Sequence, residues 1–182
     1  MIPVGYMYKT VHERPDWLKT EQVSDIYSVS SCVSEDFADW INYWEHNGYW
    51  FFNSPKDIEK LAIKNDIDLR EMTLFYYTAY EYQWDEFERR WEKYQPESSF
   101  DINVKIPKET ISHGFDIVTF LNQNDAECSP LSCNHLAQDT AVTEHCLLAN
   151  FLNARELLES GKFDRCEPRP YRIFEVHTLK CA

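Results

Sequence analysis

The sequence predicts a single α+β domain over residues 1–182, with a mixed or antiparallel sheet and three to four helices. Three observations support this fold class. A chain of 182 residues is long enough for one well-buried core. Its composition, with 43% hydrophobic and 27% charged residues, is that of a globular domain. Apolar residues alternate between the helical and the strand period without a regular βαβ rhythm, which argues against a doubly wound sheet.

In the first half of the chain we expect short strands at Val4–Lys9 and Asp25–Ser30. A helix is expected from Ser34, because Phe37, Trp40, Ile41 and Trp44 follow it at helical spacing and Asn47–Gly48 forms a stop signal. The remaining expectations for this half are a strand at Tyr49–Phe52, a helix from Ser54 and Pro55 to about Lys64, a strand at Glu71–Tyr82, and a helix carrying Trp84, Phe87, Trp91 and Tyr94.

The second half opens with a clear alternation from Phe100 to Ile106, which predicts a strand. Another strand is expected at Phe115–Leu121, a loop at Asn122–Asn134, and a helix from about Asn150 to Ser160 that ends at Gly161. Tyr171–His177 alternates as a closing strand. The only candidate for an internal boundary is the stretch 95–99.

The charge of the chain limits the kinds of partner it can bind. The formal net charge is −13, with −9 in residues 1–100 and −4 in residues 101–182. Such a field repels phosphate backbones and anionic lipid, so we expect no nucleic-acid binding and no membrane binding. All six tryptophans lie in the more acidic half, between Trp17 and Trp91. These features favour a basic protein as partner.

The aromatic, acidic segment around residue 40 is the candidate for a partner-binding surface. On the predicted helix, acids would steer a basic partner while tryptophans anchor the centre of the contact. The alternative is that the apolar stripe faces the core and the acids face water. The residues predicted to bind a partner are Asp36, Asp39, Trp40, Trp44 and Glu45.

The N-terminus shows no signal peptide and no apolar run reaches the length of a membrane helix, so a cytoplasmic location is expected. In the cytoplasm the six cysteines are expected to be reduced, and metal binding, catalysis or simple burial are favoured over disulfides.

Cysteine and histidine gather in the stretch from Cys128 to Cys146. Thiolate and imidazole are the ligands of tetrahedral zinc, and Cys128, Cys133, His135 and Cys146 are the candidate metal ligands. The spacing fits no standard zinc module, and the alternative is that Cys146 packs as a small buried hydrophobe. A cysteine-dependent enzyme would need a thiolate beside a base, for which Cys133, His135 and His145 are the candidates.

With four glycines the chain offers no phosphate-binding loop of the common types, which disfavours nucleotide binding by such loops and leaves other kinds of pocket open. The segments Asp25–Pro55, Cys128–Leu148 and Glu167–Val176 resemble an uncharacterised bacterial protein family, and this resemblance implies no activity.

The sequence therefore favours two function classes, and a catalytic pocket without a recognisable motif is a third alternative. The first is an acidic cytoplasmic protein-binding protein of the inhibitor or immunity type, without a cofactor, that engages a basic partner. The alternative is a zinc-binding or cysteine- and histidine-dependent enzyme with its site in residues 128–146.

Overall fold

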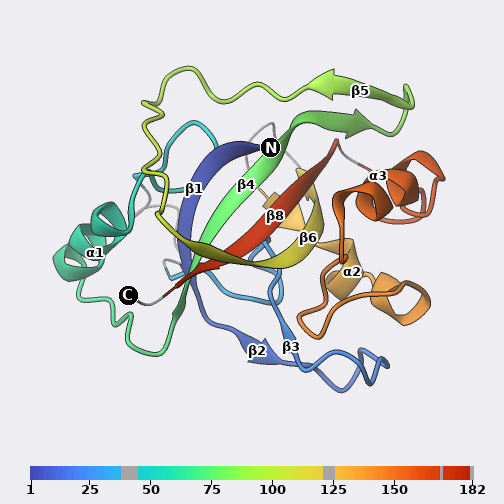
Figure 1. The fold of residues 1–182 in the computed structure, drawn as a ribbon, viewed down its shortest axis with the longest axis horizontal. Coiled ribbons are helices and arrows are strands. Elements are labelled where there is room, and N and C mark those ends of the chain that lie inside the picture. The colour runs from blue at the N-terminus through green and yellow to red at the C-terminus, as the bar shows by residue number, and fades with distance from the viewer. Residues whose placement is uncertain (38–44, 121–125, 169, 181–182) are drawn as a thin grey trace.

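The computed structural model describes residues 1–37, 45–120, 126–168 and 170–180, and its main element is a curled antiparallel sheet (Figure 1). In the described residues this sheet has six strands, in the order β1-β4-β8-β6-β7, with β5 paired to β4. A separate two-stranded sheet joins β2 to β3. The strands are β1 Ile2–Lys9, β2 His12–Glu13, β3 Asp25–Ile26, β4 Thr73–Asp85, β5 Arg90–Lys93, β6 Thr110–Phe120, β7 Ala126–Cys128 and β8 Tyr171–Leu179.

The helices of the described residues lie at two ends of the sheet. Helix α1 lies at one end, and α2 and α3 lie at the other (Figure 1). These helices span Pro55–Lys64 (α1), Pro130–Cys133 (α2) and Phe151–Glu159 (α3), and a 3₁₀ turn, η2, spans Leu136–Asp139. The α+β class is therefore confirmed, with the antiparallel form of the sheet and with strands dominating the fold.

The two longer helices agree with their local sequence signals. Helix α1 begins after Ser54, which has extended backbone, with Pro55 in the first helical turn. Helix α3 begins after Asn150, whose side chain accepts a 2.9 Å hydrogen bond from the Asn153 backbone N–H. Gly161 follows α3 with a φ of +82°, a conformation that favours glycine.

Strand β8 is buried on both faces and connects the two halves of the core. Phe174 and Val176 belong to one hydrophobic cluster, and Tyr171 and Ile173 belong to the other. This assignment follows from the alternation of side chains along a strand. The central position of β8 between β4 and β6 places the last strand of the chain in the middle of the fold.

The helix predicted over Trp84–Tyr94 is wrong. Strand β4 continues to Asp85 and turns back as β5, so that Trp84 lies opposite Trp91 in an antiparallel hairpin. The Asp85 carboxylate accepts hydrogen bonds from the backbone N–H groups of Phe87 and Glu88, which closes the turn. The hairpin brings both tryptophans to one face, and this produced the spacing that resembled a helix.

Two predicted strands are not strands. Tyr49–Phe52 lies in a turn, where Trp50 has a φ of +67°, and only an isolated bridge joins Phe52 to Tyr6. The segment from Phe100 to Ile106 is in no sheet; Asn53 holds it instead, accepting from the N–H of Asn103 and of Lys105. Phe100, Ile102 and Ile106 are exposed, so the alternation here reflects neither strand pairing nor a buried side.

The expectations for residues 25–48 also change. Of the strand expected at Asp25–Ser30, only the first two residues pair, in β3. The residues from Ser34 to Phe37 are not helical, because Asp36 bridges Lys9 of β1 and the Ser34 hydroxyl donates to the Ile26 carbonyl. Residues 38–44, where the predicted helix would continue, lie outside the described residues. Gly48 lies in a turn and does not cap a helix.

In the part of the chain that the structure describes, no helix has both the length and the apolar character needed to cross a membrane.

Candidate functional site

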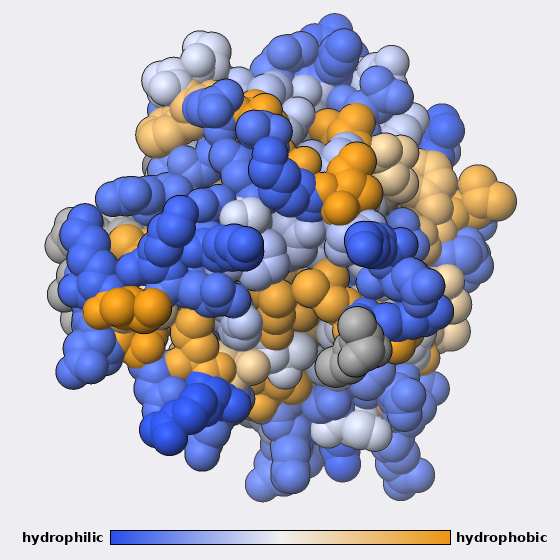
Figure 2. Space-filling view, turned by 60° about the vertical axis from the view of Figure 1, so that its left-hand side comes forward, coloured by the Kyte–Doolittle hydropathy of each residue, from blue (hydrophilic) through white to orange (hydrophobic). Residues whose placement is uncertain are grey.

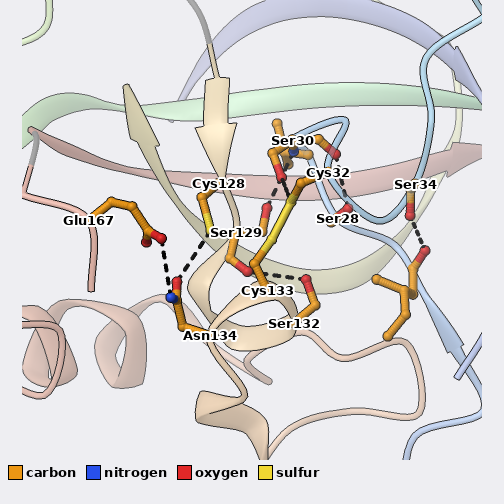
Figure 3. The surroundings of a disulfide bond; sticks show 12 residues. Ser28, Ser30, Cys32, Ser34, Cys128, Ser129, Ser132, Cys133, Asn134 and Glu167 are labelled. Carbon is orange, nitrogen blue, oxygen red and sulfur yellow. Dashed lines mark hydrogen bonds between the residues drawn. A yellow bond between two sulfur atoms is a disulfide. The ribbon is translucent and has the colours of Figure 1, made fainter. Parts of the chain in front are cut away.

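Three cysteines from distant parts of the chain meet beside α2 (Figure 3). The sulfur atoms of Cys32, Cys128 and Cys133 all lie within 4.8 Å of one another. Cys32 follows β3, Cys128 ends β7, and Cys133 ends α2. We call these three residues the cysteine cluster. Cys32 and Cys133 form a disulfide across 101 positions of sequence, with their Cα atoms 7.0 Å apart.

The local sequence explains why two of these cysteines meet. Ser129 stands directly before α2 and Pro130 occupies the first helical turn, where proline is well tolerated. The backbone N–H of Cys133 donates to the Ser129 carbonyl at 2.9 Å. This single helical turn brings Cys133 back toward Cys128, which a four-residue spacing alone does not guarantee.

The third cysteine is brought in by the segment 28–36, which buried polar groups fasten to the sheet. The Asp116 carboxylate on β6 accepts from the Val29 N–H at 2.8 Å and from the Ser129 hydroxyl at 2.6 Å. The same hydroxyl accepts from the Ser30 N–H at 3.3 Å. One buried carboxylate thus ties the segment of Cys32 and the helix of Cys133 to the same strand.

A fully buried lysine fastens the other side of this segment. The Lys9 ammonium donates to the carbonyls of Val29 and Ser30 at 2.9 and 3.0 Å, and to the Asp36 carboxylate at 2.6 Å. Its side chain has no solvent exposure and that of Asp36 has 10%. A buried charge needs such partners, so the ion pair fixes the path of the chain on both sides of Cys32.

The three cysteines differ in exposure and in their surroundings. Cys32 is exposed, Cys133 is half-buried, and Cys128 is 4% exposed. Cys128 donates to the Asn134 side-chain carbonyl at 3.3 Å, and Asn134 donates to Glu167. Burial raises the pKa of the Cys128 thiol, and the charges of Glu167 and Asp116 raise it further. In the absence of a cation this thiol is therefore protonated.

Asp116 is itself perturbed. Burial raises the pKa of this carboxyl from 3.8 to about 6, although the hydrogen bonds from Ser129 and Val29 oppose the shift. Its residue is 1% exposed. The Asp116 carboxyl therefore titrates around pH 6. It holds both the segment of Cys32 and the helix of Cys133, through Val29 and Ser129.

The predicted metal ligands are separated by the fold. Cys128 and Cys133 belong to the cysteine cluster, whereas His135 and Cys146 do not. The ring of His135 packs against Trp17, with centroids 4.8 Å apart. Cys146 is 3% exposed inside the hydrophobic core, and its pKa is raised to about 12, mainly by burial. The alternative that Cys146 packs as a small hydrophobe is the one observed.

Cys32 is not among the predicted ligands, because it lies 96 positions before Cys128 and nothing in the sequence around it indicates a ligand. The expectation that all cysteines are reduced is also corrected, since Cys32 and Cys133 are bonded. The fastening of residues 28–36 against α2 puts these two sulfurs side by side.

The predicted catalytic bases have other contacts. The Asp25 carboxylate accepts a 2.6 Å hydrogen bond from His145 Nδ1, and the His145 ring stacks on Tyr27 with centroids 3.9 Å apart. His135 contacts the Gln138 side chain at 3.2 Å. These contacts tie each histidine to neighbouring loops, while Cys133, the predicted nucleophile, lies in the disulfide.

The predicted partner-binding residues are only partly described. Asp36 is held by Lys9, and Glu45 is exposed with its carboxylate 3.6 Å from the Lys64 ammonium. Asp39, Trp40 and Trp44 lie outside the described residues. A basic partner on this segment stays a prediction.

No known protein family, no curated protein and no solved structure matches this chain. The resemblance to an uncharacterised bacterial family also stays a prediction.

Proposed function

We propose that this protein is a redox-controlled zinc-binding protein whose site is the cysteine cluster. The observation that carries the proposal is the meeting of three sulfur atoms within 4.8 Å. Three thiolates supply three of the four ligands of a tetrahedral zinc ion, and thiolates select soft metals over magnesium or calcium. The fourth position is left for water or another small ligand. Exposed Cys32 gives the ion a path from solvent.

The surroundings favour a cation at this position. Glu167 and Asp116 act on Cys128 in the direction that disfavours a lone thiolate, and the same negative charges attract Zn²⁺. The net charge of −13 acts in the same sense over a longer range. Zinc binding then deprotonates the thiols and releases their protons to solvent.

The disulfide makes zinc binding dependent on the redox state, because it uses two of the three sulfurs. An oxidised low-molecular-weight disulfide, such as glutathione disulfide, accepts two electrons and becomes two thiols while the sulfurs of Cys32 and Cys133 join. Zinc leaves, and solvent supplies three protons, one to Cys128 and one to each of the two glutathione sulfurs. Reduction by two thiols reverses each step.

The test measures zinc binding and thiol oxidation on the same protein. Reduced, metal-free protein is titrated with Zn²⁺ against a chromogenic chelator, and the expected result is one ion per chain. Glutathione disulfide is then added, and zinc should leave as a peptide containing the Cys32–Cys133 bond appears in mass spectrometry. Failure of the reduced protein to bind zinc would overturn the proposal.

Two serine variants separate the roles of the cysteines. Cys128→Ser should still form the disulfide but bind zinc at least about 100-fold more weakly, because about 10–16 kcal/mol is shared among four ligands in structural zinc sites. Cys166→Ser, a half-buried free cysteine outside the cluster, is the matched control and should behave as wild type. Equal zinc affinity of wild type and Cys128→Ser would show that the ion binds elsewhere.

A further inference from the structure

A hollow on the other side of the molecule carries an arrangement of charge unusual for this chain. Its volume is about 590 Å³, and it lies between the segment that leads into β6 and the strands β1 and β8. Figure 2 turns the left-hand side of Figure 1, with α1, toward the viewer and shows apolar patches among the hydrophilic side chains there. The residues that line the hollow and carry the argument are Tyr6, Lys105, Ile106, Lys108, Leu179 and Lys180.

The charge of the hollow has the opposite sign to that of the whole protein. Three lysines line it and one acid, Glu109, whose carboxylate is 3.3 Å from the Lys180 ammonium. The chain as a whole has 18 basic and 31 acidic residues. A cavity lined by three lysines and one acid therefore has a local charge opposite to the net charge of the protein. A local excess of positive charge in a concave site attracts and retains anions.

The remaining wall is aliphatic and aromatic. Ile106, Leu179 and the methylene stems of the lysines supply apolar surface, and Ile106 is 72% exposed. The three lysines that line the hollow are exposed, so it combines apolar wall surface with a net positive charge open to solvent. The ligand that fits both features is an anion with an apolar body.

The hollow is a preformed part of the fold. The Tyr6 hydroxyl donates to the Lys105 carbonyl, and the Lys105 N–H donates to the Asn53 carbonyl at 2.8 Å. The ring of Tyr6 packs on Tyr76 of β4, with centroids 5.0 Å apart. These contacts hold the end of the segment Phe100–Ile106, which pairs with no strand, in place as one wall of the hollow. A preformed site avoids the cost of ordering its walls on binding.

We infer that this hollow binds a medium-chain aliphatic carboxylate, with the carboxylate at Lys105 and Lys108 and the alkyl chain against Ile106 and Leu179. The inference concerns other residues than the cysteine cluster and does not rest on it. Two interactions would stabilise the complex: a charge-assisted hydrogen bond between the carboxylate and the lysines, and burial of the alkyl chain against the apolar side chains.

The test is calorimetric titration of the full chain with decanoate, with 1-decanol and acetate as the two partial probes. Decanoate should bind, decanol should bind at least about tenfold more weakly without the charge-assisted contact, and acetate should show no binding. Raising the salt concentration should weaken decanoate binding, since exposed charges are screened. Equal binding of decanol and decanoate, or binding of acetate, would overturn the inference.

A pair of double variants locates the site. Lys105→Met with Lys108→Met keeps the apolar stems and removes two charges, and should raise the Kd for decanoate at least about tenfold. Lys56→Met with Lys93→Met removes the same charge from exposed lysines outside the hollow and should leave the Kd unchanged. Thermal unfolding of both variants shows whether they fold as wild type. Two folded variants with the same Kd would place decanoate elsewhere and refute the assignment.

Discussion

Replacing Asp116 by asparagine should stabilise the protein at neutral and higher pH. The carboxyl is 1% exposed and its pKa is raised from 3.8 to about 6 by burial. Between these two values the native state keeps a proton that the unfolded chain has lost, so stability falls as pH rises through this window. A rise from 3.8 to about 6 costs about 3 kcal/mol above the window, at about 1.4 kcal/mol per pH unit.

Asparagine has nearly the same shape and carries no charge at any pH. Its side-chain carbonyl can accept from the Val29 N–H and the Ser129 hydroxyl as Asp116 does. Relative to its value below about pH 3, the stability of Asp116→Asn over wild type should therefore be larger by about 1.5 kcal/mol at pH 5 and by about 3 kcal/mol at pH 8. Urea unfolding of oxidised, metal-free protein at a series of pH values measures this difference, and the comparison cancels the other titrating groups.

A difference that does not change with pH would refute this reasoning, because only ionisation of Asp116 makes it grow. Asp68→Asn is the matched control. That carboxyl is exposed, and hydrogen bonds from Arg70 lower its pKa to about 2, so the variant should not gain stability as pH rises. Ser129→Ala should raise the pKa of Asp116 further and extend the window at its upper end, since it removes a hydrogen bond to the carboxylate.

Three further predictions concern stability. Reduction of the metal-free protein should lower the free energy of unfolding by up to about 4.7 kcal/mol, the chain-entropy value for a loop of about 100 residues such as the one that Cys32 and Cys133 close. Lys9→Met should cost about 3–5 kcal/mol in urea unfolding, because it removes the cation of a buried ion pair with Asp36. Asn150→Ala should lower stability by about 1 kcal/mol through loss of its cap on α3, measured by the same unfolding.

Each of these has a control in the chain. Reduction of Cys32→Ser should leave its stability unchanged. Lys64→Met breaks an exposed pair with Glu45 and should cost less than about 1 kcal/mol. Ser54→Ala removes an N-cap residue whose side chain makes no cap hydrogen bond, so it should cost less than Asn150→Ala. Equal costs within either variant pair, or a stability loss on reduction of Cys32→Ser, would contradict the stated reason.

Helices α1 and α3 could be predicted because their signals are local. Pro55 after Ser54 and Asn150 before a periodic run act within one helical turn, and Gly161 ends α3 by its own conformation. Strands β1 and β8 could be predicted for a similar reason, since each is a run of strand length whose apolar residues are visible in the local sequence. None of these signals depends on a distant residue.

The errors occurred where spacing had two physical explanations. Trp84 and Trp91 are seven positions apart, which suits two turns of one helix and equally a hairpin that pairs them. The residues from Phe100 to Ile106 alternate between apolar and polar, yet Phe100, Ile102 and Ile106 are exposed. Hydrogen bonds with Asn53 and Tyr6 hold this segment, and no strand pairs with it. Sequence spacing shows which residues can share a side, not which element they form or whether that side is buried.

The sequence by itself determined the α+β class, the negative charge, and two of the three residues of the cysteine cluster, because composition and local spacing carry this information. Only the tertiary structure decided that Cys32 joins Cys128 and Cys133 while His135 and Cys146 do not. The physical reason is that a buried carboxylate on β6 and a buried lysine on β1 fasten residues 28–36 against α2. A contact across about 100 positions depends on such buried partners, and no local pattern records them.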